Sequence, residues 1–255
     1  MLDQSIQDWD ARRKWIVAGD TQETIQMAAE HWAHSAQRAI QQHDGFFVAL
    51  SGGSTPKAIY QYLVTHLKKE IDWSKVHLFW SDERAVSADQ AESNYKMAMD
   101  SGFKDLPIPH TQIHRMKGDG NIKQHASEYE KILKAKLEHR LFDLVILGVG
   151  DDGHTASLFP NTAALLETEK LVVANHITEK NTWRMTLTTH CINLSEHAVI
   201  YAIGKAKEAI VPLVLQAAIT SPFPASAIGT ADRPALWILD NAAARLISKP
   251  DNNSL

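Results

Sequence analysis

A histidine and two aspartates follow a short apolar stretch in the middle of the chain, in the sequence Gly-Val-Gly-Asp-Asp-Gly-His. The apolar residues 144–147 are typical of a buried parallel strand, and the glycines permit a sharp turn after it. His154 has the chemistry of a general acid or base that a nearby carboxylate orients. Asp152 lies two positions before His154, so an extended backbone would project both to one side, with Asp151 as the alternative partner. These residue types predict a catalytic turn, and a loop of structural aspartates is the alternative.

A second glycine-rich loop has the composition of an anion site. The sequence Gly-Gly-Ser-Thr-Pro at 52–56 follows the apolar residues 46–50. Glycines let successive amides converge, hydroxyls add donors, and the start of a helix adds positive potential. The glycine spacing is not that of a Walker A loop, and no Gly-Lys-Ser/Thr follows. Thr55 before Pro56 also fits an ordinary helix cap, so a phosphate site and a tight turn both remain open.

The catalytic stretch also matches the pattern Gly-x-Gly-x-x-Gly of dinucleotide-binding loops. Asp151 and Asp152 would lie inside that turn, where their charges would repel a pyrophosphate. A catalytic role is therefore favoured over nucleotide binding. The chain has no Gly-x-Ser-x-Gly elbow, and its lone Cys191 has no motif of a nucleophile.

The chain has 13 histidines, so a metal site has to be considered. His31 and His34 share a helix face, and His110 and His114 would do so if their loop were helical. Neither pair has the His-Glu-x-x-His pattern or an evident third ligand. Packed or solvated histidines are the better explanation, and we expect neither a metal nor another cofactor.

Composition excludes several classes of protein. The 255 residues carry a formal net charge of −4, which gives no basic face for nucleic acid. One cysteine rules out an internal disulfide, which fits a reducing compartment. The first residues lack the pattern of a signal peptide, and no apolar stretch approaches the roughly 18 residues of a membrane span. We expect a soluble, cytoplasmic protein without nucleic-acid or membrane partners.

Apolar strands alternate with amphipathic helices, which predicts an α/β protein with a mainly parallel sheet and helices on both faces. No linker, repeat or low-complexity tract divides the chain, so residues 1–255 are predicted to form a single domain. Expected strands or extended segments are 46–50, 76–80, 114–116, 144–147, 171–174, 183–188, 199–203 and 236–239. Expected helices are 20–43, 56–67, 93–102, 121–140, 205–217 and 242–247.

Taken together, these loops resemble the 6-phosphogluconolactonases, a branch of the glucosamine-6-phosphate deaminase-like fold. The matching sequences are Leu-Ser-Gly-Gly-Ser-Thr-Pro at 50–56, Asp-Glu-Arg at 82–84 with Ser-Asn-Tyr at 93–95, and the whole of 148–160. Weaker matches lie at 183–187 and 204–207. The resemblance implies a Rossmann-like sheet and the hydrolysis of 6-phospho-D-glucono-1,5-lactone to 6-phosphogluconate in the pentose phosphate pathway.

The resemblance also implies roles for individual residues. His154 is the expected catalytic base, with Asp152 beside it. The phosphate would be held by Gly53, Ser54 and Thr55 together with Arg184 and Lys205. Arg84 would contact the sugar acid, and Asn94 would support the loop that carries Arg84. Either Arg84 or an amide of Gly52 or Gly53 could stabilise an oxyanion. The residues expected at the substrate are Gly52, Gly53, Ser54, Thr55, Asp82, Arg84, Asn94, Arg184 and Lys205.

Two other functions stay open. A glucosamine-6-phosphate deaminase is the nearest, but that branch carries a glutamate five residues after the histidine, where this chain has Phe159. A sensor that binds a sugar phosphate without chemistry is the other. In each case the expected partner is a small sugar phosphate, and the chain would be a monomer or a homodimer.

Overall fold

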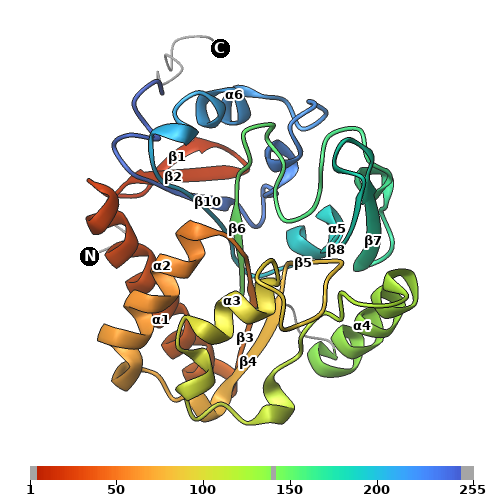
Figure 1. The fold of residues 1–255 in the computed structure, drawn as a ribbon. Helices are drawn as coiled ribbons and strands as arrows, with labels where there is room; N and C mark the ends of the chain where they lie inside the picture. Colours follow the sequence, from red (N-terminus) through yellow and green to blue (C-terminus); the bar gives the residue numbers. More distant parts are fainter. Residues whose placement is uncertain (1–4, 139–141, 248–255) are drawn as a thin grey trace.

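The computed structural model describes residues 5–138 and 142–247, and a seven-stranded sheet runs through them (Figure 1). Its strands pair in the order β1-β2-β10-β9-β6-β3-β4, and every neighbouring pair is parallel except the β1–β2 hairpin. The predicted α/β class with a mainly parallel sheet is confirmed. The strands are β1 (Gln7–Asp10), β2 (Arg13–Val17), β3 (Phe46–Leu50), β4 (Val76–Trp80), β6 (Leu144–Gly148), β9 (Ala198–Ala202) and β10 (Ala235–Leu239).

Helices cover this sheet on both faces (Figure 1). On one side α1 and α2 pack against each other and contact β3, β9 and β10, and on the other lie α4 and α5. The first helix begins as its sequence predicts, because Asp20 and Glu23 form a capping box. The helices are α1 (Thr21–His43), α2 (Ser54–Tyr62), α3 (Asn94–Asp100), α4 (Ile122–Leu137), α5 (Thr189–Asn193) and α6 (Ile210–Gln216).

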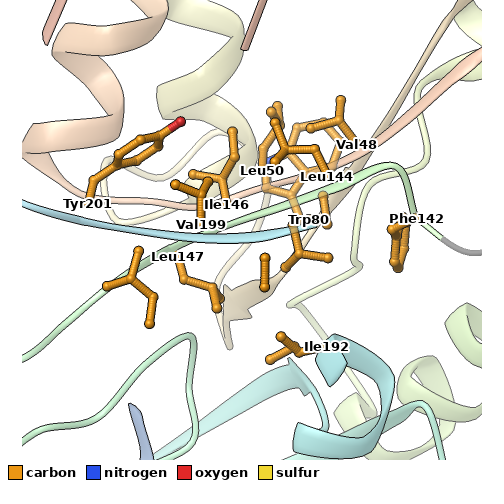
Figure 2. Packing of buried hydrophobic residues seen from close by; sticks show 14 of the residues in the cluster. Val48, Leu50, Trp80, Phe142, Leu144, Ile146, Leu147, Ile192, Val199 and Tyr201 are labelled. Atoms are coloured by element: carbon orange, nitrogen blue, oxygen red, sulfur yellow. The ribbon is translucent and has the colours of Figure 1, made fainter. Parts of the chain in front are cut away.

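The central strands are buried on both faces, as their continuous apolar sequences indicate. Figure 2 shows Ile146 and Leu147 on opposite sides of β6, with Ile192 of α5 on the same side as Leu147. All three side chains are fully buried. Burial of a side chain of this size stabilises a fold by about 1.5–3 kcal/mol, so the helical layers on both faces hold β3 and β6 rigidly.

A second sheet, absent from our sequence-based expectation, stands beside the first. It consists of β5 (Asp82–Arg84), β8 (Thr182–Leu187) and β7 (Val172–Ile177), all antiparallel, and α4 packs on β7 and β8. The polar three-residue β5 has no strand-like pattern of its own, so the sequence alone did not reveal its pairing with β8. This pairing places Arg84 directly opposite Arg184.

Three further expectations about secondary structure are wrong. Residues 114–116 form no strand, although the preceding Ile113 bridges to Leu78 of β4. The expected helix at 205–217 is divided into a 3-10 turn (Lys205–Lys207) and α6, in which Pro212 occupies the first turn and needs no amide partner. The expected helix at 242–247 is also absent: residues 242–246 form turns, because so short a segment gains too few hydrogen bonds to complete a helix.

The order of the strands determines where a ligand can bind. From β3 the chain proceeds to β4 on one side, whereas β6 lies on the other side of β3 and leads away to β9. The direction of connection therefore reverses between β3 and β6, and ligands of parallel α/β sheets bind beyond the carboxyl ends at such a point. The 52–56 loop follows β3 and the catalytic turn follows β6, so both predicted loops flank this position.

His114 makes the stability of this fold sensitive to acid. Its ring is almost fully buried and stacks on Phe79 with centroids 4.5 Å apart, and its Nε2 has no hydrogen-bond partner in the described part of the chain. Burial and, secondarily, His77 and Lys136 lower its pKa to about 4. In the unfolded chain the pKa returns to roughly 6.5, so the unfolded state takes up the proton first as the pH falls. This contribution to stability is complete above pH ~6.5 and is lost between pH ~6.5 and ~4.

We therefore expect the free energy of unfolding to fall by up to about 3 kcal/mol between those pH values through this residue. Urea titrations at pH 7 and pH 4.5 measure the difference, and His114→Leu should reduce it. The exposed His110, changed to Leu, is the matched control. Equal acid sensitivity of wild type and His114→Leu would contradict the expectation.

Candidate active site

The turn after β6 brings His154 and Asp152 into contact. Asp152 Oδ1 lies 2.5 Å from His154 Nδ1 and also accepts the backbone amide of His154 at 3.0 Å. Burial raises the pKa of Asp152, but its hydrogen bonds to His154 and the charge of that ring outweigh burial and hold the pKa below its ordinary value. An ionised carboxylate on Nδ1 leaves Nε2 as the basic nitrogen, and no described residue hydrogen-bonds to Nε2.

The structure also distinguishes the two aspartates. The exposed carboxylate of Asp151 accepts a hydrogen bond from Lys207 Nζ at 2.7 Å. Of the two open alternatives, Asp152 is the carboxylate that contacts His154. The backbone makes this possible at Gly150, where a Cβ would stand 2.0 Å from His154 Nδ1.

Hydroxyl groups after His154 tie the turn to the rest of the site. Thr155 donates to the carbonyl of Gly148 at 2.8 Å, and Ser157 donates to Asp82 Oδ2 at 2.6 Å. Thr162 donates to the carbonyl of Phe159 at 2.7 Å. From the sequence alone, these three hydroxyls could be mistaken for nucleophiles. Because each donates a hydrogen bond to another part of the site, we assign them to positioning the turn.

The loop after β3 opens toward the same edge of the sheet. Gly53 adopts φ +108°, a conformation that favours glycine, and α2 begins at Ser54. The sequence suggested Thr55 as a possible cap, but Gly53 occupies the N-cap position and no side chain caps the helix. The hydroxyls of Ser54 and Thr55 therefore remain available beside the free amides of the helix start, which is the arrangement of an anion site.

Gly52 is required for a different reason. A Cβ at this position would stand 1.8 Å from Asn94 Oδ1, and Asn94 is buried with its amide donating to Asp82. We expect Gly52→Ala to displace Asn94 and to lower kcat/KM about a hundredfold, because misplacement of about 1 Å costs that much. Steady-state kinetics measures the effect, with Gly148→Ala as the control, since a Cβ there meets nothing within 4 Å. Equal activity of the two variants would contradict this account.

Asp82 lies at the centre of the predicted site, but both of its carboxylate oxygens already accept hydrogen bonds from other side chains of the protein. Its side chain is buried, Oδ1 accepts from Asn94 Nδ2 at 3.0 Å, and Oδ2 accepts from Ser157 Oγ. Asp82 thus joins the start of α3 to the catalytic turn. The geometry fits a residue that positions both loops better than one that contacts the substrate directly.

The sequence analysis gave no role to Glu83, yet this buried residue organises the start of α3. Its carboxylate accepts from the amides of Arg84, Asn94 and Tyr95 at 2.7–2.9 Å and from Ser93 Oγ at 3.0 Å. Burial raises the pKa of Glu83 although these hydrogen bonds oppose the shift. The sequence signal that could have identified Glu83 was its position in the Asp-Glu-Arg motif, between Asp82 and Arg84.

Two arginines face each other across β5 and β8, and among the described residues neither guanidinium has a carboxylate partner. Arg84 and Arg184 are register partners, and the Nε atom of each is buried and unbonded in the described structure. Arg84 donates through Nη1 to the carbonyl of Glu92 at 2.7 Å. Burial and then the charge of Arg84 lower the pKa of Arg184, against the opposing effect of Asp82 and Glu83. Two neighbouring guanidiniums with unused donors are chemically suited to a phosphate or a carboxylate.

Lys205 and Lys207 lie in one 3-10 turn after β9, and their environments differ. Lys205 is exposed and has no ion-pair partner among the described residues. Lys207 reaches the catalytic turn through Asp151. The sequence analysis selected Lys205 of Gly-Lys-Ala-Lys and gave Lys207 no role, because the direction of each side chain depends on the turn that follows Gly204.

Within residues 5–138 and 142–247, no group of three or more histidine, cysteine, aspartate or glutamate side chains is arranged to hold a metal ion. In the same part of the chain, none of the helices combines the length and apolar character required to cross a bilayer. Cys191 is buried and its pKa is raised to about 12 by burial, so it is not a thiolate nucleophile.

The fold and the site define a sugar-phosphate enzyme class that comparison with known proteins makes explicit. Residues 19–237 match the family described as glucosamine-6-phosphate isomerases/6-phosphogluconolactonase. The chain is 40% identical over 247 residues to a 6-phosphogluconolactonase of Chlamydia muridarum, covering 95% of this chain and 93% of the relative. The chain therefore belongs to the glucosamine-6-phosphate isomerase/6-phosphogluconolactonase family.

Solved structures agree with this assignment. A 6-phosphogluconolactonase from Trypanosoma cruzi superposes with a TM-score of 0.83 at 27% identity, covering 95% of this chain and 99% of that one. A monomeric glucosamine-6-phosphate deaminase matches with a TM-score of 0.77 at 22% identity, covering 91% and 99% of the two chains. Since both branches share the fold, residues of the site have to distinguish them.

Proposed function

We infer that this protein is a 6-phosphogluconolactonase, which hydrolyses 6-phospho-D-glucono-1,5-lactone to 6-phosphogluconate in the pentose phosphate pathway. The observation that carries the inference is the catalytic turn, in which Asp152 holds His154 and Phe159 occupies the place of the acid expected in a deaminase. Sequence identity to curated lactonases over nearly the whole chain supports it.

In this mechanism His154 acts first as a base and then as an acid. Nε2 takes a proton from water as the water oxygen attacks C1 of the lactone. Collapse of the tetrahedral intermediate breaks the bond between C1 and the ring oxygen, and the imidazolium returns its proton to that oxygen. The product carries a carboxylic acid and a free hydroxyl. General acid–base catalysis of this kind contributes about 10²–10⁴-fold.

The substrate's phosphate is assigned to the positive edge of the site. The start of α2 supplies amides and the hydroxyls of Ser54 and Thr55, and Arg184 supplies a guanidinium with unused donors. Arg84, next to Arg184 on the paired strand, is left to contact the sugar acid and the oxyanion. Amides of Gly52 and Gly53 remain the alternative donors to the oxyanion.

Between the two lysines we favour Lys207 as the phosphate ligand, because its ion pair with Asp151 places it at the catalytic turn. We expect Lys207→Met to raise KM about tenfold and Lys205→Met to raise it less, since one charge-assisted hydrogen bond contributes about 1.5–3 kcal/mol. Initial rates over a range of lactone concentrations give both values. A larger KM effect for Lys205→Met would return the role to the residue that the sequence analysis selected.

Freshly prepared lactone provides the direct test. Acid release near neutral pH should be faster with the protein than in a control without enzyme, which corrects for spontaneous hydrolysis. Release of ammonia from glucosamine-6-phosphate would establish the deaminase instead. Tight binding of 6-phosphogluconate in calorimetry, without turnover of any lactone, would establish a sensor.

Three accompanying proposals concern the whole molecule. One contiguous apolar core joins elements from Ile16 to Ala243, which supports a single domain. The single buried cysteine fits a cytoplasmic location. The chain acts on a small molecule as a monomer or a homodimer, and size-exclusion chromatography with light scattering distinguishes the two.

A further inference from the structure

Phe159 lies against the catalytic imidazole. The rings of His154 and Phe159 are stacked with centroids 4.0 Å apart and an interplanar angle of 18°. Phe159 is only 6% exposed, and its carbonyl is held by Thr162. One face of the catalytic ring is therefore covered by a fixed aromatic surface.

A lysine contacts the same phenyl ring. Lys180 Nζ lies over Phe159, 4.6 Å from the ring centroid. Lys180 comes from the connection between β7 and β8, the same hairpin that carries Arg184.

The hydrogen bond between Asp152 and Nδ1 fixes one atom of the imidazole but leaves the ring free to pivot about it. A stacked ring removes this freedom, because tilting the imidazole would break face-to-face contact. The direction of Nε2, which must meet the attacking water, is thereby set. Aromatic pairs of this kind contribute about 0.5–1.5 kcal/mol beyond their burial, and a cation over the ring about 0.5–1 kcal/mol at exposed sites.

We propose that Phe159 is a positioning residue that fixes the plane of the catalytic imidazole, and that Lys180 acts through Phe159 by clamping its ring. The proposal rests on the proposed lactonase function. Position 159 is where a deaminase would carry a glutamate. The proposal gives the phenylalanine at this position its own role in lactone hydrolysis. Neither side chain binds substrate in this scheme.

The kinetics of two variants test the proposal that Phe159 positions the imidazole of His154. Phe159→Leu should lower kcat about tenfold and leave KM unchanged, because it keeps an apolar side chain but loses the flat face. Phe159→Tyr should restore kcat to within about twofold of the wild type, since the stacked ring is retained. Unchanged kcat in Phe159→Leu, or failure of the tyrosine variant to restore it, would overturn the proposal.

Substitutions of the exposed Lys180, alone and in a double-mutant cycle with Phe159→Leu, test whether Lys180 acts through Phe159. Lys180 is exposed, so Lys180→Met should fold normally, and we expect kcat to fall about threefold at constant KM. Lys180→Arg should restore it, and Lys170→Met, at an exposed lysine nearer the start of the hairpin, should have no effect. In the Phe159→Leu background, Lys180→Met should change nothing further.

Additive effects in that cycle would show that Lys180 acts independently of Phe159, and a raised KM in Lys180→Met would make it a substrate ligand. Either result overturns the clamp. These results differ from failure of the proposed function, in which the wild-type protein itself would show no lactonase activity.

Discussion

His154→Gln is expected to reduce kcat for lactone hydrolysis about a thousandfold and to leave KM within about twofold of the wild type. Glutamine retains polarity and approximate size but cannot take a proton from water, so the loss corresponds to general-base catalysis. Because the proposed phosphate ligands are the start of α2, Arg184 and Lys207 and not His154, substrate binding should persist. Rates must be corrected for spontaneous hydrolysis of the lactone.

The matched control for this variant is His34→Gln, at an exposed histidine on α1. Its kcat should equal that of the wild type. If His154→Gln retained full activity, the catalytic role of the imidazole would be refuted. If its KM rose while kcat was unchanged, His154 would be a binding group, which is the result that a sensor-like site predicts.

Arg184→Met is expected to raise KM about a hundredfold with a much smaller change in kcat. Truncating one partner of a buried charged hydrogen bond costs about 2–5 kcal/mol, and methionine preserves the aliphatic stem of arginine. Arg184→Lys should recover only part of the affinity, since an ammonium cannot form the bidentate contact of a guanidinium. Initial-rate measurements over a wide range of lactone concentrations give both parameters.

The same variant should be no less stable than the wild type. Burial and the neighbouring Arg84 disfavour the charge of Arg184 in the unliganded protein, as the lowered pKa of Arg184 reflects, so its removal relieves a repulsion. Thermal unfolding with and without inorganic phosphate checks this: phosphate should raise the Tm of the wild type more than that of Arg184→Met. Arg245→Met, at an exposed arginine, serves as control. An unchanged KM would place the phosphate elsewhere.

The pair of Arg84 and Arg184 lowers the stability of the empty protein but favours binding of an anionic substrate. Two like charges on paired strands, with buried Nε atoms that have no described partner, cost free energy in the empty site. An anionic substrate satisfies both at once. The cost is offset by the surrounding scaffold, in which Glu83 and Asp82 accept six hydrogen bonds from the start of α3 and the turn after β6, donated by Ser93, Asn94, Tyr95 and Ser157.

Much of the parallel sheet could be predicted from local patterns. The strands at Phe46–Leu50 and Val76–Trp80 have the boundaries expected from their apolar runs, because a strand buried on both faces must be continuously apolar. The β1–β2 hairpin and β5 were missed, since their polar or half-exposed residues carry no such pattern. Extended segments were expected at 171–174 and 183–188, where β7 and β8 lie, but their pairing with β5 in a separate sheet was not. They are strands because a partner strand completes their hydrogen bonds.

For the turn after β6, the sequence by itself determined which residue types are available for the proposed chemistry: glycines, Asp152 and His154 at fixed spacing, followed by Phe159 rather than an acid. Local spacing suffices there because Asp152 and His154 are two residues apart and share one turn. Only the tertiary structure decided that Asp151 pairs with Lys207, that Asp82 is enclosed by Asn94 and Ser157, and that Phe159 lies on the imidazole. The first two depend on contacts between segments distant in the chain, and the third on how the backbone folds back after the turn. No periodicity encodes these arrangements.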